Sequence, residues 1–447
     1  MVSENNRMSG RVRRYARVGT SVGGLAARMA GQRYLGMPSS PAKNAAELRR
    51  ALGGLKGPLM KVAQLLATIP DGLPKDYIEE LRVLQSQAPA MGWAFVKRRM
   101  RSELGTDWQS RFKSFEQEAA AAASLGQVHR AHSLDSRLLA CKLQYPDMAS
   151  TVEADLSQLK MIFTLYKRYD PAIDTSEVLS ELTARLREEL DYVREALHLR
   201  LFAELFAEES GVYVPEVIPE LSTARLLTMT WLDGAPLLDA RTAPQDARDR
   251  IARNLFTAWY YPLYHYGVLH GDPHLGNYTI RPNGAVNLLD YGCVRILPAR
   301  FIQGVIDLYH AVQKDDRELM MYAFESWGFT GLSAELTDAL AIWAKYIYGP
   351  LTDDRVRLID ESGSGKFGGS IAAQTHNEIR RLGGVKLPRE FVLLDRSAIG
   401  LGSVFLHLGA KLNWHHAFEL LIEDFEADTL DRRQSEILDR TGVPEAA

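Results

Sequence analysis

Apolar residues recur every three to four positions between residues 44 and 105. This spacing places them on one side of a helix, so the segment is predicted to be helical. The stretch 69–74, Ile-Pro-Asp-Gly-Leu-Pro, interrupts the pattern and is typical of a turn between two helices. We therefore expect a helical extension over residues 44–112, preceded by an arm that lacks this spacing.

The pattern changes after residue 112, where short apolar runs are bounded by turn residues. Four segments are predicted to be strands: 128–131, 137–143, 212–217 and 225–231. Between the second and third lies a long helical region, which Asp174 opens as an N-cap with Glu177 three residues later. That region is expected to run to about residue 209.

From residue 246 onward the pattern is mostly helical. The exception is a pair of apolar runs, 278–280 and 285–289, which flank Asn283-Gly284 and so predict a β-hairpin. The glycine-rich stretch 362–369 is expected to be a mobile loop. The order of elements predicts an α+β fold of two lobes, a small mixed lobe and a larger helical one, joined by a hinge near residues 231–234. Two lobes with a cleft between them suit a nucleotide enzyme.

The composition is that of an ordinary globular protein, since 46% of the 447 residues are hydrophobic and 24% are charged. There are 53 Lys and Arg residues against 56 Asp and Glu residues, a net charge of −3. A dedicated nucleic-acid binder is usually clearly basic, so no nucleic-acid partner is expected. The two cysteines, Cys141 and Cys293, argue against a disulfide framework and fit a reducing compartment.

The first 43 residues form a basic arm in which Glu4 is the only acid. Two interpretations remain open: a solvated tail, or an anchor for anionic lipid, where each cation contributes about 1 kcal/mol. The apolar stretches 18–31 and 397–410 fall short of the roughly 20 residues that a membrane crossing needs. A cytoplasmic protein is expected, with peripheral membrane contact as an option. The arginines of the arm are Arg7, Arg11, Arg13, Arg14, Arg17, Arg28 and Arg33.

The strongest chemical signal is the sequence His270-Gly-Asp-Pro-His-Leu-Gly-Asn277, followed after the predicted hairpin by Asp290-Tyr-Gly. An Asp and an Asn five residues apart, followed by Asp-aromatic-Gly, form the catalytic arrangement of kinases. Phosphoryl transfer needs a carboxylate to orient the attacking hydroxyl, and an amide oxygen and a second carboxylate to hold Mg²⁺. Asp272 fits the first role, and Asn277 and Asp290 fit the metal-binding roles.

A kinase also needs a cation for the α- and β-phosphates, and Lys142 is the one charge in an apolar strand. Upstream, at the position of a phosphate-binding loop, lies an alanine-rich stretch that could equally begin a helix. Three acids after it, Glu189, Asp191 and Glu195, could pair with Lys142. The first two would point about 200° apart on a continuous helix, so they could share one site only if the helix is broken. The loop residues are Ala121, Ala122, Ala123 and Ser124.

Together these residues resemble the UbiB/AarF family of atypical kinases, which includes bacterial and mitochondrial ubiquinone-biosynthesis proteins. The resemblance covers about residues 55–414. Its motifs correspond here to Lys61-Val-Ala-Gln64, Ala121-Ala-Ala-Ser124, Lys142-Leu-Gln-Tyr-Pro146, Glu189 with Asp191, Glu195 and Met229-Thr-Trp-Leu-Asp-Gly234. One departure is Ala63, which stands where the family has a glycine.

The resemblance implies a two-lobed protein-kinase-like fold with a helical N-terminal extension. It also implies that the protein binds ATP or ADP and Mg²⁺, that Lys61 and Gln64 fold over the active site, and that Glu195 takes the place of the partner of Lys142. The expected division is an arm (1–43), the extension (44–112), a kinase-like N-lobe (113–231) and a helical C-lobe (232–447).

No Ala-Pro-Glu motif follows Asp290-Tyr-Gly, and a helix is predicted from about residue 301, so there is no room for an activation segment. Phosphorylation of other proteins is therefore not expected. Three functions remain open: a phosphotransferase or ATPase acting on a lipophilic small molecule such as a quinone precursor, a lipid-stimulated ATPase that presents a lipid precursor, and a nucleotide sensor without turnover.

Overall fold

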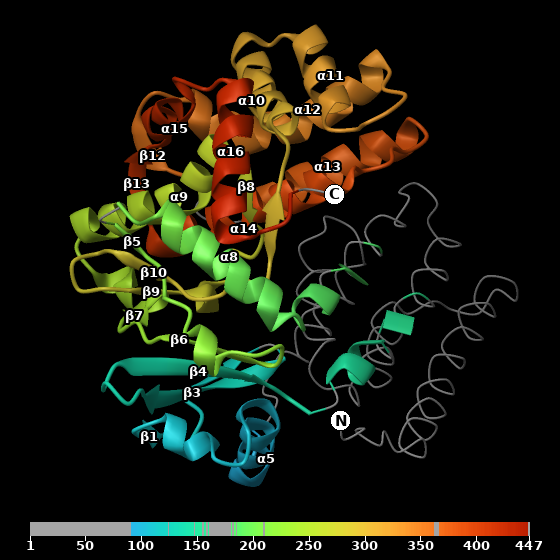
Figure 1. The fold of residues 1–447 in the computed structure, drawn as a ribbon. Coiled ribbons are helices and arrows are strands. Elements are labelled where there is room, and N and C mark those ends of the chain that lie inside the picture. Colours follow the sequence, from blue (N-terminus) through green and yellow to red (C-terminus); the bar gives the residue numbers. More distant parts are fainter. Residues whose placement is uncertain are drawn as a thin grey trace, which may run out of the picture.

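A computed structural model describes most of the chain from residue 91 onward. The described residues are 91–123, 125–146, 148–153, 156–157, 160, 180, 183–184, 186–208, 211–361 and 366–445. The basic arm, Lys61, Gln64 and Ser124 lie outside them. Figure 1 shows a small lobe built on a sheet, a larger lobe rich in helices, and helix α8 (Tyr192–Leu205) between them. This arrangement confirms the predicted two-lobed α+β fold.

The smaller lobe contains a five-stranded antiparallel sheet in the order β1-β3-β4-β6, with β2 also paired to β3. The strands β3, β4 and β6 confirm three of the four predicted strands. The fourth prediction, 212–217, is largely wrong. Only β5 (Val212–Tyr213) is a strand there, and it pairs in parallel with a strand of the larger lobe. The sheet strands are β1 (Ser114–Phe115), β2 (Ala121–Ala123), β3 (Gly126–His132), β4 (Leu138–Gln144) and β6 (Leu226–Thr230).

Side chains alternate across strand β4, which determines where Lys142 points. Leu139, Cys141 and Leu143 are buried in one hydrophobic core with helix α5 (Trp93–Leu104), the 3₁₀ helix η1 (Trp108–Arg111) and the aromatic residue Phe112. Successive side chains of a strand point to opposite faces, so the even-numbered residues of β4 face the other way. Ala140 accordingly belongs to the core of the larger lobe, and Lys142 points away from α5.

Within the described residues, the larger lobe contains eight helices and three small sheets. The first sheet has the order β5-β10-β9-β7, the second pairs β8 with β11, and the third pairs residues 356–358 with residues 411–413. The helices are α9 (Gln245–Tyr266), α10 (Ala299–Lys314), α11 (Arg317–Ser326), α12 (Ala334–Tyr348), α13 (Lys366–Arg381), α14 (Arg389–Leu408), α15 (Trp414–Ile422) and α16 (Ala427–Thr441). The strands are β7 (Ala235–Pro236), β8 (Val268–His270), β9 (Tyr278–Ile280), β10 (Val286–Leu288) and β11 (Val294–Ile296). Short 3₁₀ helices lie at Pro219–Leu221 (η2), Leu237–Thr242 (η3), Leu275–Asn277 (η4) and Gly349–Thr352 (η5).

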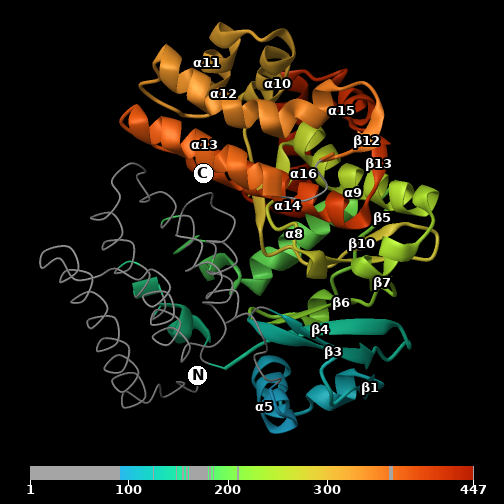
Figure 2. The ribbon, with the colours of Figure 1, turned by 180° about the vertical axis from the view of Figure 1, so that it is seen from behind.

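Strands β9 and β10 form the hairpin predicted from Asn283-Gly284, with Tyr278 opposite Leu288 and Ile280 opposite Val286. The prediction of a mobile loop over the glycine-rich stretch 362–369 is wrong for residues 366–369, which belong to α13. Residues 362–365 lie outside the described residues. Figure 2 shows α13 beside α12, with which it packs.

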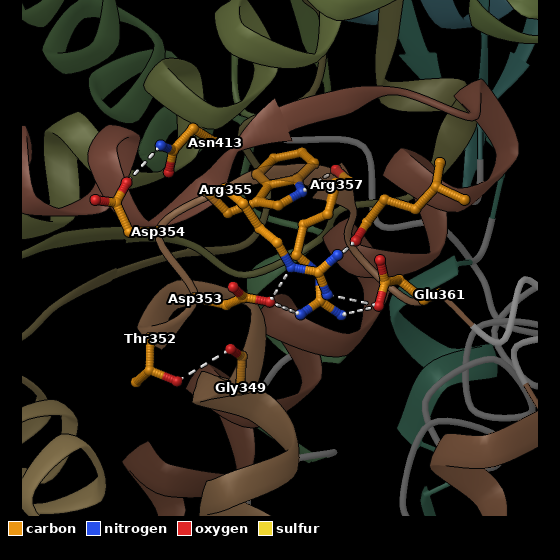
Figure 3. Close-up of polar contacts among 10 residues, drawn as sticks. Gly349, Thr352, Asp353, Asp354, Arg355, Arg357, Glu361 and Asn413 are labelled. Atoms are coloured by element: carbon orange, nitrogen blue, oxygen red, sulfur yellow. Dashed lines mark hydrogen bonds and ion pairs between the residues drawn. The ribbon is translucent and has the colours of Figure 1, made fainter.

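A small pair of antiparallel strands, β12 (Val356–Leu358) and β13 (Lys411–Asn413), joins the chain before α13 to the chain just after α14. A network of charges surrounds it: Arg355 bridges Asp353 and Glu361 at 2.8 Å each, and Arg357 also contacts Asp353 at 2.6 Å (Figure 3). Exposed pairs of this kind contribute little individually. A hydrogen bond from Nδ2 of Asn413 to Oδ1 of Asp354 at 2.7 Å links this segment to β13, and so to the chain just after α14 (Figure 3).

One helix of the described part, α14, is long and apolar enough to cross a membrane by length and composition, and 39% of its apolar window is buried. In the sequence, only the second part of this helix belongs to the apolar stretch 397–410, which is shorter than a membrane crossing needs. Within the fold, Leu401, Val404 and Phe405 of α14 lie in the core of the larger lobe.

Candidate active site

Lys142 lies at the centre of a group of buried charges between the lobes. Its Nζ atom is 2.5 Å from Oε1 of Glu195 on α8 and 3.2 Å from Oδ2 of Asp290. Only 7% of Lys142 and 2% of Glu195 are exposed. Burial lowers the pKa of Lys142, but the carboxylates of Asp290 and Glu195 outweigh it and raise that pKa well above its usual value. Lys142 is therefore a fixed cation, and among the three candidate acids Glu195 is the one in direct contact with it.

The helix is broken between Glu189 and Asp191, the condition under which the sequence allowed both to face one site, but Asp191 is used as a helix cap. Residues 189–190 form a turn, and Asp191 is the N-cap of α8, where its Oδ1 accepts a hydrogen bond from the backbone N–H of Arg194 at 3.0 Å. The prediction of one helix to about residue 209 is therefore wrong. Glu189 is buried, and a β-carbon added at Gly292 would lie 3.7 Å from its Cγ. Glu189 thus lies beside the Asp-Tyr-Gly segment, while Asp191 caps a helix.

The alanine-rich stretch is a strand and not the start of a helix. Ala121, Ala122 and Ala123 pair with Val128, Gln127 and Gly126, which makes a tight hairpin ahead of Lys142. Gly126 is required there, since a β-carbon would lie 2.1 Å from the carbonyl oxygen of Leu143. The hairpin occupies the position at which a phosphate-binding loop was expected.

The loop after β8 carries Asp272, which is 7% exposed. Its backbone N–H donates to Nδ1 of His270 at 3.3 Å, and its carbonyl oxygen accepts from Nδ2 of Asn277 at 2.9 Å. Its carboxylate Oδ1 accepts from Nη2 of Arg396 at 3.0 Å. The backbone and the side chain of Asp272 are therefore both held in place.

Asp290 and Asn277 meet at the same end of the β9–β10 hairpin, because the N–H of Leu289 donates to the carbonyl oxygen of Asn277 at 2.8 Å. Asp290 accepts from the N–H of Gly292 at 3.0 Å, and its carbonyl oxygen contacts Nε2 of His270 at 2.7 Å. The amide nitrogen of Asn277 donates to the carbonyl oxygen of Asp272, so metal ligation by Asn277 would use its amide oxygen. Carboxylate and amide oxygens are ligands that Mg²⁺ accepts, so these residues fit such an ion.

His198 on α8 was not identified from the sequence, although it lies three residues after Glu195 and so near the same helix face. It is buried, and its Nδ1 contacts the carbonyl oxygen of Tyr291, the residue between Asp290 and Gly292, at 3.1 Å. Burial, together with the charge of Arg194, lowers the pKa of His198 to about 4. His198 thus links α8 to the Asp-Tyr-Gly segment in its neutral form.

This burial predicts a loss of stability in acid. Because the folded pKa of His198 is below the unfolded value of 6.5, the unfolded chain binds the extra proton between pH 6.5 and about pH 4. Each pH unit in that window should cost about 1.4 kcal/mol, a stability that is fully present above pH 6.5. His198→Asn should reduce the fall in melting temperature between pH 7.5 and 5.5, whereas His416→Asn at an exposed site should not. An equal fall in all three proteins would contradict this role.

The chain is similar to known atypical kinases. Residues 83–323, more than half of the chain, match the ABC1 atypical kinase-like domain. The mitochondrial atypical kinase COQ8B of Rattus norvegicus is 29% identical over 392 residues, which cover 85% of this chain and 71% of that protein. The mitochondrial atypical kinase coq-8 of Caenorhabditis elegans is 28% identical over 325 residues, or 70% of this chain and 43% of that protein.

A solved structure is also similar: Rv3197 of Mycobacterium tuberculosis in complex with erythromycin, with a TM-score of 0.59 and 27% identity. The match covers 85% of this chain and 96% of that one. The chain spans about half the length of the curated relatives from C. elegans, Arabidopsis thaliana and Dictyostelium discoideum. The domain match and these relatives confirm the resemblance inferred from the motifs: the chain belongs to the ABC1 atypical kinase-like family, the UbiB/COQ8 group.

Proposed function

We propose that the protein binds ATP or ADP with Mg²⁺ between its lobes and acts as an atypical kinase or ATPase on a small lipophilic substrate such as a quinone precursor. The observation that carries this proposal is the contact of Lys142 with both Glu195 and Asp290. A strand lysine held by a helix glutamate, beside an Asp-aromatic-Gly aspartate, is the arrangement that phosphoryl transfer uses.

In this proposal, each residue of the site has a role in binding the nucleotide or in catalysis. Lys142 binds the α- and β-phosphates while Glu195 fixes its position, and the hairpin of Ala121–Ala123 closes over the phosphates. Asn277 and Asp290 would hold Mg²⁺, and the bound ion would supply positive charge against the negative charge of the phosphates. Asp272 orients the attacking hydroxyl or water.

The substrate is expected to be small, because little chain separates the site from the next helix. Strand β11 ends at Ile296 and α10 begins at Ala299, a segment in which a protein kinase would place its peptide-binding shelf. The names of the relatives support a role in mitochondria or chloroplasts for those proteins. For this chain, a cytoplasmic location and a quinone-like substrate are proposals.

The decisive experiment measures ATP turnover by the purified chain, with and without anionic liposomes and a phenolic mimic of a quinone precursor. Transfer of phosphate to the mimic supports the phosphotransferase. Phosphate release that rises with liposomes and leaves the mimic unmodified supports an ATPase that presents lipid. Nucleotide binding with no turnover under any of these conditions would contradict both and leave a nucleotide sensor.

The basic arm gives a separate prediction, on binding to membranes. The seven arginines of the arm before residue 34 should bind anionic vesicles weakly, because charge attraction is screened over about 8 Å at physiological ionic strength. Cosedimentation with such vesicles should fall as salt is added. A chain without residues 1–36 should cosediment less, and equal binding by the shortened chain would rule out the arm.

A further inference from the structure

Helix α14 packs directly on the loop that carries Asp272, from three positions on one face. Nη2 of Arg396 lies 3.0 Å from Oδ1 of Asp272, and Oγ of Ser397 donates to the carbonyl oxygen of His270 at 3.4 Å. One turn later, Gly400 meets Pro273 so closely that an added β-carbon would lie 2.4 Å from its Cγ. The helix therefore determines where this loop sits.

The pair of Arg396 and Asp272 is buried, with side chains only 10% exposed on each side. Such a pair does little for stability, because removing two charges from water costs about as much as their attraction returns. Moreover, Nη1 of Arg396 is buried without a hydrogen-bond partner among the described residues. Both facts argue that this arginine serves the chemistry at Asp272 more than the stability of the fold.

The loop itself supplies no permanent cation next to Asp272, since residues 270–277 contain neither lysine nor arginine. Lys142 contacts Asp290 and Glu195 instead. The cation beside Asp272 comes from Arg396, 124 positions further along the chain.

We propose that Arg396 is a positioning residue for the reaction, which holds the carboxylate of Asp272 in the orientation that accepts the substrate hydroxyl. The backbone of Asp272 is already fixed through His270 and Asn277. Holding Oδ1 then fixes the rotation of the planar carboxylate, and with it the direction of the second oxygen. Groups that act on a reacting hydroxyl must be placed to within a fraction of an ångström. This inference rests on the proposed function.

The test is a double-variant cycle in the full-length chain, with ATP turnover and nucleotide affinity measured on each protein. Arg396→Gln should lower kcat by about 10²-fold and change the nucleotide Kd by less than about twofold. Asp272→Asn should lower turnover by about 10³-fold or more, to a residual rate that is still measurable, and preserve binding. Because Arg396 acts through Asp272, the double variant should turn over no more slowly than Asp272→Asn alone. Arg396→Lys, which keeps the charge, should recover part of the loss.

A matched control is Arg440→Gln on α16, which removes an exposed ion pair with Glu204 and should leave turnover unchanged. Unchanged or increased turnover in Arg396→Gln would overturn the proposal, and so would a further large loss in the double variant. Normal turnover in Asp272→Asn would instead contradict the proposed function. If Arg396→Gln melts early, Gly400→Ala gives the same comparison with the charge retained: it should lower kcat without weakening nucleotide binding, and an unchanged kcat would overturn the proposal.

Discussion

Asp290→Asn is expected to remove the Mg²⁺-dependent part of nucleotide binding and to lower turnover by about 10³-fold. The substitution keeps the shape of the side chain and its hydrogen bond from Gly292, but removes the charge that Mg²⁺ requires. Lys142 still has Glu195 as a partner, so the fold should persist. Binding of nucleotide without metal, through Lys142, should therefore survive.

The measurement is the melting temperature with ATP, with and without Mg²⁺. A ligand at 100 times its Kd stabilises the folded state by about 2.7 kcal/mol, so the loss of the metal-dependent part is readily seen. Asp354→Asn is the matched control, since Asp354 is a surface residue bound by Asn413 (Figure 3). Undiminished Mg²⁺-dependent stabilisation in Asp290→Asn would show that the metal lies elsewhere.

The parts of the site that lie close together in the sequence could be predicted from it. Asp272 and Asn277 share one loop, and a hairpin with a clear Asn-Gly turn returns the chain to Asp290. These relations depend on local spacing and turn chemistry, which a single sequence contains. The strand environment of Lys142 was predictable for the same reason: an isolated charge in an apolar run is visible without the fold.

The parts of the site that depend on how helices end and pack could not be predicted. The partner of Lys142 stayed open because the answer depends on a helix break at residues 189–190, and Asp191 caps the next helix instead of facing the site. Arg396 gave no signal at all, since its relation to Asp272 arises only when α14 packs on the loop. From the sequence alone, Arg396 only marks the start of the apolar stretch 397–410.

Very short strands were missed for a related reason. Strands β8 and β11 have three residues each and pair with each other, although the whole β9–β10 hairpin separates them in the sequence. Periodicity needs a longer window than three residues to distinguish a strand from a loop. Similarly, residues 212–217 are predicted as a strand of the smaller lobe, but β5 pairs with β10 of the larger lobe. In both cases tertiary contacts outweighed local preference.

Lys142→Met is expected to have the other large effect, on stability and on nucleotide affinity together. Removing the cation leaves Glu195, 2% exposed, close to Asp290 with no compensating charge. Breaking a buried pair in this way costs about 3–5 kcal/mol, and nucleotide affinity should fall by about 10²-fold or more as the phosphates lose their cation. Melting temperature and a nucleotide titration measure the two effects.

The double variant Lys142→Met/Glu195→Gln separates those effects, because a neutral amide no longer needs a cation. Its melting temperature should recover towards that of the unaltered chain, while nucleotide affinity stays low. If affinity recovers as well, Lys142 supports the fold and does not bind phosphate.

Lys61→Ala, outside the described residues, is the informative comparison. The helical extension is predicted to restrain the site, so this variant should change turnover and still bind nucleotide. A loss of binding as complete as that of Lys142→Met would make Lys61 a direct nucleotide ligand and contradict the restraining role.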